Sequence, residues 1–390
     1  MQAQLYVCDT EAEPLDRYRP GGYHPVELGD HLQEGRYRIV HKLGWGGYST
    51  TWAAKDQRED KYVAIKVPVA DANHGRELNV MQKLSTLPRR HPGWFYLNQL
   101  SDSFTIDGPN GIHNCLVSEI IGPNVADFVD TYCKDNRLPA ELARLFAKQA
   151  LQGLDFLASN GIGHGDIHTR NLAIVVSDLA FSDEETFFNK LGKPEMSEVR
   201  KLDGTPLTNE VPAYLVRPTS FRHRKAPMSS RSVKIIDFGE AFFDNSPPHT
   251  LHTPLPLRAP EVVFGDQLDH RIDLWSAACM IFELVTGQPP FDVIMLTPPI
   301  LVQQMMELAT DKMPSRWQAE CQTMLKSISA EDDRHTLRQW LEEVYFDNDR
   351  FAELSRHDIQ IIGGLIERML KFDPSLRATA RDVLAEEWFC

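Results

Sequence analysis

Residues 162–175 read IGHGDIHTRNLAIV, and this stretch decides how the rest of the chain is interpreted. A polar turn carries Asp166 and Asn171 and leads directly into a short apolar run, which predicts a buried strand at 172–176. Asp166 can accept a proton from a hydroxyl nucleophile, and Asn171 offers an amide oxygen to a hard cation such as Mg²⁺. Asp and Asn are also ordinary turn residues before a strand. The flanking sequence must therefore decide between the two interpretations.

The composition describes an ordinary globular protein of 390 residues, 42% hydrophobic and 25% charged, long enough for two cores. Apolar runs fall short of the roughly eighteen residues of a membrane span, and the N-terminus does not resemble a signal peptide, so we expect neither insertion nor secretion. Six cysteines without a Cys-x-x-Cys pair predict reduced thiols in the cytosol or nucleus. The net charge of −14 disfavours nonspecific nucleic-acid binding and favours basic partners.

A glycine-rich turn lies between two predicted strands, 36–43 and 50–54. The turn reads GWGGYS over residues 44–49, and its glycines would let backbone amides close over a polyphosphate. A plain hairpin turn would look the same. Because no helix follows the glycines, the dinucleotide-binding fold is not the right template.

The next predicted strand, 62–67, has Lys66 in its apolar core, where a lysine is costly unless it is paired. The helical stretch 74–84 supplies Glu77 just before its apolar face. We therefore predict a Lys66–Glu77 ion pair that presents the ammonium group to phosphate oxygens. The alternative is a strand-edge lysine in solvent.

The chain divides near residue 121, where strand patterns give way to helical ones. We predict an N-terminal extension at 1–34, a strand-rich small lobe at 35–121 and a helix-rich large lobe at 122–390. An insertion at 177–232 is Pro-interrupted and weakly periodic, so we expect a surface loop that is partly disordered.

Further polar motifs follow the insertion. A predicted strand at 233–236 ends in the Asp-Phe-Gly sequence of residues 237–239, and Asp237 beside Asn171 would complete a divalent-cation site. Ala-Pro-Glu follows at 259–261, and Asp273 opens a strongly apolar helix. The remainder is predicted to be helical.

In this order the motifs match the protein-kinase signature set: glycine-rich loop, strand lysine, polar turn, Asp-Phe-Gly and Ala-Pro-Glu. Residues 35–390 therefore resemble a eukaryotic serine/threonine protein kinase. The resemblance implies a two-lobed α+β fold, with a small antiparallel-sheet N-lobe that carries one helix and a larger, mainly helical C-lobe.

The resemblance narrows to the SR-protein kinases, which phosphorylate serines in Arg/Ser-rich splicing factors. It rests on GGYHPV at 21–26, KLGWG at 42–46, NGIHNC at 110–115 and LQGLD at 151–155. A split kinase core also suits this group, although the insertion here is short. The resemblance implies basic Arg/Ser-rich protein substrates, a role in mRNA splicing regulation, and a monomer that binds neither nucleic acid nor membrane. It also implies cytoplasmic and nuclear localisation.

The resemblance assigns roles to residues. ATP would bind the loop, the paired lysine and the segment between the lobes, a set comprising Leu43, Gly44, Trp45, Gly46, Gly47, Tyr48, Ser49, Lys66, Glu77, Glu119 and Ile121. The implied catalytic residues are Asp166, Lys66, His168 and Asn171, with Asp166 orienting and deprotonating the serine hydroxyl. Asn171 and Asp237 would hold Mg²⁺. As scaffold, Glu261 would pair with Arg377 and Asp273 would cap the backbone of the catalytic turn.

Three positions depart from the family pattern. Gly165 replaces the arginine that would neutralise a phosphorylated activation loop, so we predict activity without phosphate in residues 240–257. His168 replaces the lysine that steadies the γ-phosphate, which puts the rate in question. Ser118 is small where the SR group has a bulky residue, which predicts a pocket behind the adenine.

Two other functions compete with the interpretation as a protein kinase. The first is a pseudokinase or scaffold that binds nucleotide and partners without turnover, and the second is a small-molecule kinase, whose catalytic loop has a similar His-Gly-Asp-x-His pattern. If the protein is a protein kinase, Asp266 and Asp269 could face substrate arginines. The serine- and arginine-containing run at 220–232 could occupy an acidic groove in cis or be autophosphorylated.

Overall fold

The computed structural model describes residues 5–71, 75–176, 179–219, 231–291, 293, 295–326, 335–347 and 351–389. The chain forms two compact units. The smaller unit contains the described parts of 1–87, 98–123 and 176–230, and the larger unit contains those of 88–97, 124–175 and 231–390. Among the described residues, no helix has both the length and the apolar character needed to cross a membrane.

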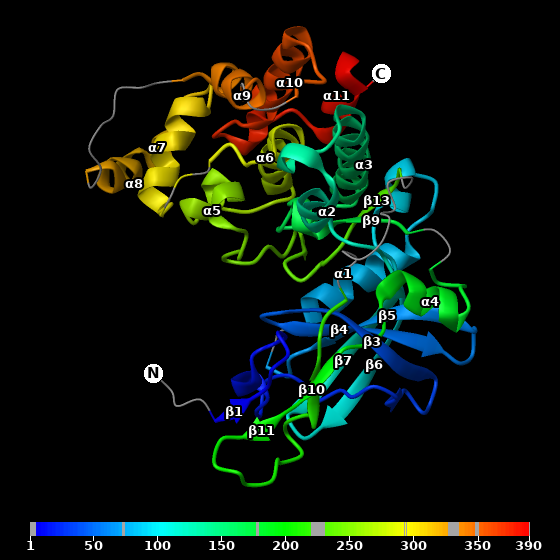
Figure 1. Cartoon of the computed structure of the whole chain (residues 1–390). Coiled ribbons are helices and arrows are strands. Elements are labelled where there is room, and N and C mark those ends of the chain that lie inside the picture. Colours follow the sequence, from blue (N-terminus) through cyan, green and yellow to red (C-terminus); the bar gives the residue numbers. More distant parts are fainter. Residues whose placement is uncertain are drawn as a thin grey trace. The chain divides into compact units, whose positions relative to one another are not determined.

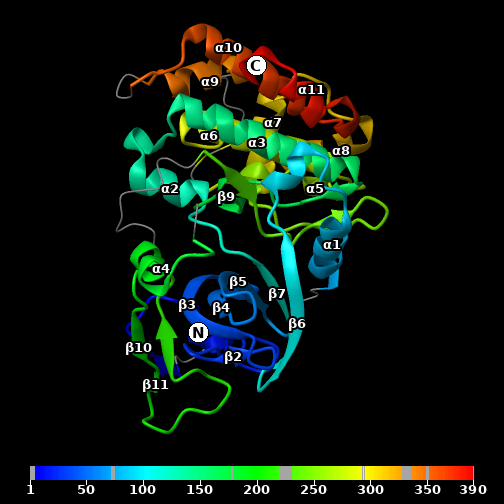
Figure 2. The same ribbon diagram turned by 90° about the vertical axis from the view of Figure 1, so that its right-hand side faces the viewer.

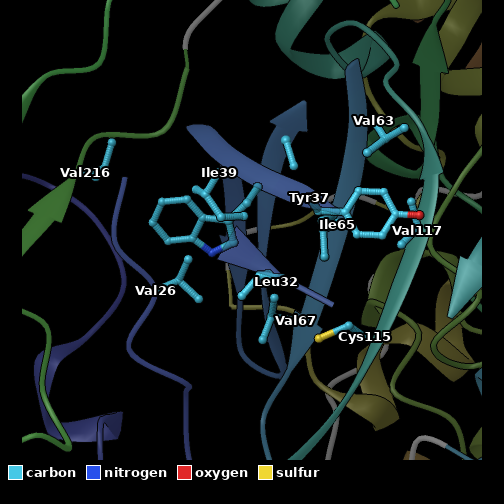
Figure 3. Close-up of a cluster of buried hydrophobic side chains, with 12 residues drawn as sticks. Val26, Leu32, Tyr37, Ile39, Val63, Ile65, Val67, Cys115, Val117 and Val216 are labelled. Atoms are coloured by element: carbon cyan, nitrogen blue, oxygen red, sulfur yellow. The ribbon is translucent and has the colours of Figure 1, made fainter. Parts of the chain in front are cut away.

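The smaller unit is built on a six-stranded antiparallel sheet in the order β2-β3-β4-β5-β7-β6 (Figure 1). Its strands are β2 (His31–Leu32), β3 (Tyr37–Gly46), β4 (Ser49–Asp56), β5 (Lys61–Pro68), β6 (Leu100–Gly108) and β7 (Gly111–Glu119), and helix α1 spans Gly75–Thr86. Alternate residues of β5, Val63, Ile65 and Val67, enter one buried cluster because strand side chains alternate between faces (Figure 3). The same cluster contains Val216 from the insertion.

The insertion and the N-terminal extension both belong to the smaller unit, so the prediction of an irregular large-lobe loop is wrong for residues 179–219. The insertion contributes α4 (Glu184–Leu191), β10 (Met196–Glu198), β11 (Arg200–Lys201) and β12 (Tyr214–Val216), and the extension contributes β1 (Tyr6–Val7) and the short helix η1 (Leu15–Arg17). Strand β1 pairs with β11, and β10 pairs with β12. Figures 1 and 2 both show α4, β10 and β11 beside the sheet.

Helix α4 is held by a few apolar side chains in an otherwise polar stretch. Asp183 caps it by accepting a hydrogen bond from the Thr186 amide. Phe187 stacks on Tyr62 of β5, with ring centroids 3.7 Å apart and an interplanar angle of 15°. Leu191, Phe187 and Tyr62 belong to one buried cluster, which is separate from the cluster that contains Val216. The apolar positions are too sparse to give a clear helical period, which is why the sequence predicted a loop. Residues 177–178 and 220–230, including most of the serine- and arginine-containing run, lie outside the described residues.

The larger unit is mainly helical. Its helices are α2 (Val125–Tyr132), α3 (Ala140–Ser159), α5 (Pro260–Val263), α6 (Ile272–Thr286), α7 (Pro298–Leu308), α8 (Ser315–Leu325), α9 (Leu337–Tyr345), α10 (Arg356–Met369) and α11 (Ala380–Leu384), with short helices η2 (Pro92–Tyr96), η3 (Lys134–Asn136), η4 (Thr169–Asn171), η6 (Leu255–Leu257), η7 (Pro374–Leu376) and η8 (Glu387–Phe389). Every residue of α6 except Glu283 is buried, so this helix forms the core of the unit. Helix α3 packs against α6 and α11, and α10 packs against α6 and α9 (Figure 2).

Two short antiparallel pairs bring distant parts of the larger unit together. Strand β8 (Ile162–Gly163) pairs with β14 (Phe242–Phe243), and β9 (Leu172–Ile174) pairs with β13 (Val233–Ile235). These pairs place the turn at 164–171 beside the Asp-Phe-Gly segment.

Candidate active site

The predicted ion pair between Lys66 and Glu77 is present in the smaller unit. The Lys66 Nζ atom lies 2.7 Å from Glu77 Oε1, and the side chains are 20% and 4% exposed. Lys66 stands on β5, between Thr51 of β4 and Leu116 of β7 in the sheet register. The carboxylate therefore fixes an ammonium group that keeps part of its surface accessible.

The glycine-rich turn closes the hairpin between β3 and β4, with Gly46 opposite Ser49. Trp45 is 44% exposed and Tyr48 is 60% exposed, so the two large side chains of the turn lie outside the core. A side chain at Gly44 or Gly46 would meet no heavy atom within 4 Å. The turn is thus an open hairpin whose backbone is accessible to a ligand.

The segment after β7 contains the other predicted nucleotide contacts. Glu119 ends β7, and Ile121 is half-buried two residues later. Ser118 is 9% exposed, and its hydroxyl accepts a hydrogen bond from Asn98 Nδ2 at 3.2 Å. A hydrogen-bonded asparagine therefore lies beside this small residue, where we predicted a pocket.

In the larger unit, main-chain bonding joins the catalytic turn to the Asp-Phe-Gly segment. The Ile236 amide donates to the Asn171 carbonyl at 2.9 Å, continuing the β9–β13 ladder by one step. Asp237 follows directly with a φ of 60°, an uncommon conformation for a residue other than glycine. Its Oδ1 atom accepts from the Gly239 amide at 3.2 Å. Asn171 and Asp237 thus stand at the ends of adjacent strands.

The side chains of Asp166, His168 and Asn171 form one hydrogen-bonded cluster. Asn171 Nδ2 donates to the Asp166 carbonyl at 2.8 Å and to Asp166 Oδ2 at 2.9 Å, which uses both amide hydrogens. His168 Nδ1 accepts from the Arg170 amide at 3.1 Å, so the ring proton belongs on Nε2. That nitrogen lies 3.2 Å from Asn171 Nδ2 and 3.4 Å from Asp166 Oδ2. Asn171 therefore holds Oδ2 of the aspartate, and the His168 ring lies beside both groups.

The cluster also suits a hydroxyl group and a hard cation. The Asp166 side chain is 22% exposed, although its Oδ1 atom is buried and finds no hydrogen-bond partner within the described part of the chain. Because both amide hydrogens of Asn171 point to Asp166, its Oδ1 atom is oriented away from them, as a metal ligand requires. Carboxylate and amide oxygens are the donors that Mg²⁺ prefers. Asn171 and Asp237 together fit such an ion.

The backbone of the turn is capped from below by Asp273, as predicted. Its Oδ2 atom accepts from the His164 amide at 2.6 Å, and its Oδ1 atom accepts from the Gly165 amide at 2.9 Å. Burial raises the pKa of Asp273 to about 7, while the two amide donors act in the opposite direction. His164 bonds the Ile236 carbonyl through Nε2 at 3.1 Å, and burial lowers its pKa, so the ring is neutral.

The structure explains why position 165 is a glycine, which the sequence alone did not explain. Its φ is +81°, and a Cβ atom there would lie 2.8 Å from the Glu240 carbonyl oxygen and 3.1 Å from Leu251 Cδ2. Thr253 Oγ1 also donates to the Gly165 carbonyl at 2.6 Å. The segment after Asp-Phe-Gly therefore fills the space that a side chain at residue 165 would occupy.

The predicted scaffold pair is also present. Arg377 Nη1 and Nη2 each lie 2.6 Å from one oxygen of Glu261, and both side chains are buried. By contrast, Asp266 pairs with Arg316, and Asp269 pairs with Arg271 at 2.5 Å. The two aspartates that could have faced substrate arginines are therefore engaged by arginines of the chain itself.

A strand-rich unit with a glycine hairpin and a paired lysine, and a helical unit with an aspartate–asparagine turn beside Asp-Phe-Gly, define a protein kinase. A family model described as "Protein kinase domain" matches residues 226–389. "Serine/threonine-protein kinase SRPK" of Physarum polycephalum is 31% identical over 97% of this chain and 91% of that protein. "Protein kinase dsk1" of Schizosaccharomyces pombe is 27% identical over 97% and 85%. "SRSF protein kinase 3" of Homo sapiens is 36% identical over 50% and 36%.

The chain belongs to the SRPK family of serine/threonine protein kinases. The predicted class of enzyme and the two-lobed α+β fold are thereby confirmed, with the addition that the insertion gives the smaller unit a second helix, α4. A kinase domain uses ATP, generally with a divalent cation.

The sequence did not predict which residues of the segment 238–257 would hold it beside the catalytic turn. Thr253 bonds Gly165, and Asp244 receives two hydrogen bonds from His270, at 2.8 Å from its amide and 2.6 Å from its ring. A threonine in a proline-rich stretch and an Asp–His pair 26 residues apart carry no sequence signal of their own.

Proposed function

We propose that this protein transfers the γ-phosphoryl group of Mg²⁺-bound ATP to serines of basic, Arg/Ser-rich proteins, and does so without a phosphate on its activation segment. The observation that carries the proposal is the cluster around Asp166, because Asn171 fixes the carboxylate while the Asp166 side chain remains 22% exposed to a substrate.

In this mechanism, the Asp166 carboxylate accepts the proton of the serine hydroxyl while the hydroxyl oxygen attacks phosphorus. Asn171 donates to Oδ2 and the His168 ring lies beside it, so the carboxylate keeps one orientation toward the hydroxyl. His168 is thus a positioning residue for the base. This differs from the role of a lysine, which would reach the γ-phosphate.

The nucleotide would be held by the smaller unit. Lys66, fixed by Glu77, would contact the α- and β-phosphates, and the backbone of residues 43–49 would cover them. Glu119 and Ile121 would contact the adenine. Asn171 and Asp237 would hold Mg²⁺, which neutralises the charge that develops on the phosphate oxygens.

The contacts of the segment at 238–257 support the proposal of activity without phosphorylation. Glu240 pairs with His252 at 2.9 Å, Asp244 with His270 at 2.6 Å, and Thr253 with Gly165. These contacts hold the segment beside the catalytic turn without a phosphate. A phosphate at Thr253 would break the bond to Gly165.

Acidic surface on the larger unit supports a basic substrate. A cavity of about 660 Å³ is lined in part by Glu343 and Asp347, and by Glu342, which is paired with Arg356. Glu343 lies 3.6 Å from His335, so Asp347 and Glu343 are the carboxylates that a basic substrate could meet there. The net charge of −14 agrees with this preference. The names of the relatives from Homo sapiens and Physarum polycephalum point to the same class of substrate, SR proteins.

We further propose that the protein works as a monomer in the reducing environment of the cytoplasm and nucleus. The five cysteines within the described residues are free thiols. Burial raises the pKa of Cys115 to about 12 and that of Cys133 to about 11, so neither is a reactive thiolate.

Isosteric replacement of the base tests the mechanism. Asp166→Asn keeps an acceptor for Asn171 but removes the base, so we expect kcat to fall by about 10²- to 10⁴-fold with folding preserved. The matched control is Asp127→Asn, because Asp127 is a half-exposed carboxylate that pairs with Arg170 at the surface. Phosphatase-treated enzyme is used throughout. Equal activity in both variants would contradict the mechanism, and a requirement for prior phosphorylation would contradict the mode of regulation.

A further inference from the structure

The N-terminal segment 13–24 is attached to the smaller unit by backbone bonds at a Gly-Gly turn. The Gly21 amide donates to the Asn110 carbonyl at 2.8 Å, and the Asp71 amide donates to the Gly21 carbonyl at 2.9 Å. A Cβ atom on Gly22 would lie 1.9 Å from the Arg17 carbonyl oxygen. Only glycine fits this turn, and the turn fixes the residue that follows it.

That residue, Tyr23, reaches the glycine hairpin. Its side chain is 1% exposed, its carbonyl accepts from Asn110 Nδ2 at 2.7 Å, and its hydroxyl donates to the Gly46 carbonyl at 2.8 Å. Burial raises the pKa of Tyr23, so the hydroxyl keeps the proton that it donates. The Arg17 guanidinium lies over the ring, 5.1 Å from its centroid. The tyrosine is therefore held at both ends.

A second attachment fixes the same segment to β3. Glu13 forms an ion pair with Lys42, and both side chains are fully buried. Tyr18 donates its hydroxyl to the other oxygen of Glu13. Breaking a buried ion pair leaves an unpaired charge, which is costly, so this contact keeps the segment in register with the strand that leads to Gly46.

The bond to Gly46 has a consequence for the next amide. The carbonyl of Gly46 and the N–H of Gly47 belong to one planar trans peptide, in which they point in opposite directions. A Gly-Gly peptide rotates more freely than any other, because neither residue has a Cβ atom. By holding the carbonyl, Tyr23 also holds the direction of the Gly47 N–H.

We propose that Tyr23 is a positioning residue for the nucleotide, which keeps the Gly47 amide directed at its phosphates. The proposal rests on the proposed function of the glycine hairpin in binding ATP. It assigns the N-terminal segment a part in catalysis, beyond that of a lead-in to the kinase fold.

The test compares Tyr23→Phe with Tyr37→Phe. Tyr37 is equally buried in the same unit, and its hydroxyl bonds Asp102 at 2.9 Å instead of the hairpin. We expect Tyr23→Phe to raise the KM for ATP by about 3- to 10-fold, the range of one lost hydrogen bond, with kcat and the KM for peptide within about twofold. Tyr37→Phe should leave all three unchanged. An unchanged KM for ATP in Tyr23→Phe would overturn the proposal.

Nitrogen-15 relaxation of the unliganded protein gives a second readout that does not depend on activity. The Gly47 amide should have a lower order parameter in Tyr23→Phe than in Tyr37→Phe, and equal order parameters would overturn the proposal. If the wild-type protein neither bound nor turned over ATP, the proposed function would fail, and this measurement would still report whether Tyr23 holds the hairpin. Thermal melting of both variants shows whether a general loss of stability explains either effect.

Discussion

Alanine at position 165 is expected to reduce both the stability and the turnover of this kinase. The backbone there has a φ of +81°, and the new Cβ would lie 2.8 Å from the Glu240 carbonyl oxygen. The left-handed conformation costs a non-glycine residue about 1–2 kcal/mol. Forcing a methyl group into packed structure costs about 1–3 kcal/mol. We therefore expect the free energy of unfolding of Gly165→Ala to fall by about 2–5 kcal/mol, measured by urea denaturation.

Gly265→Ala is the matched control. Gly265 has a φ of +61° in the same unit, but its new Cβ would meet no heavy atom within 4 Å. This variant should lose only the conformational cost of about 1–2 kcal/mol. The difference between the two variants isolates the contact between residue 165 and the activation segment.

The two variants should also differ in kcat. The Gly165 amide donates to Asp273 and its carbonyl accepts from Thr253, so displacing it moves the turn that carries Asp166. A displacement of about 1 Å can cost about 100-fold in rate, so kcat should fall by about 10- to 100-fold in Gly165→Ala and stay within about twofold in Gly265→Ala. Equal stability losses together with unchanged kcat would refute the packing that we describe.

Three further predictions concern the larger unit. Thr253→Ala loses one hydrogen bond to Gly165 and should cost about 0.5–1.5 kcal/mol in urea denaturation, while Thr253→Glu should not raise kcat, since the segment needs no negative charge there. The hydrogen bond that His270 donates to Asp244 raises the pKa of His270, so its contribution to stability is full below about pH 6.5 and is lost as the pH rises through the folded-state pKa. Asp273, with its pKa raised to about 7 by burial, changes stability in the same direction between about pH 4 and 7, so the urea midpoint should fall as the pH rises from about 4, and the part of the fall above about pH 6.5 should be smaller in His270→Gln; an equal fall above pH 6.5 would contradict this. Arg377→Met leaves the Glu261 carboxylate buried without its partner and should cost about 3–5 kcal/mol, whereas a loss below about 1 kcal/mol would show that the pair is not buried in solution.

The sequence predicted the strands and the paired groups of the site because each has a local cause. A lysine in an apolar strand needs a carboxylate, and Glu77 was the one that the next helix offered. Short polar side chains at a strand end, such as Asn171 and Asp237, predicted a cation site from their position alone. The structure places them at the ends of the paired strands β9 and β13, and the cation site itself stays a prediction.

The sequence could not predict the parts of the fold that depend on contacts between distant segments. Helix α4 has few apolar residues, but Phe187 meets Tyr62 from the sheet, and neither position reveals the other. Gly165 was interpreted as a missing arginine, because only the structure shows the Glu240 carbonyl next to it. The bond from Tyr23 to Gly46 joins residues of two motifs that resembled the family separately.

Phosphate transfer from ATP to an Arg/Ser-repeat peptide, compared with the same peptide carrying lysine for arginine, is the decisive assay for this kinase. We expect phosphatase-treated enzyme to phosphorylate the arginine peptide with a kcat/KM at least about tenfold higher, and Asp166→Asn to lose most of the transfer to both peptides. Nucleotide binding without transfer to either peptide would contradict the proposed function and favour a scaffold that binds ATP without turnover.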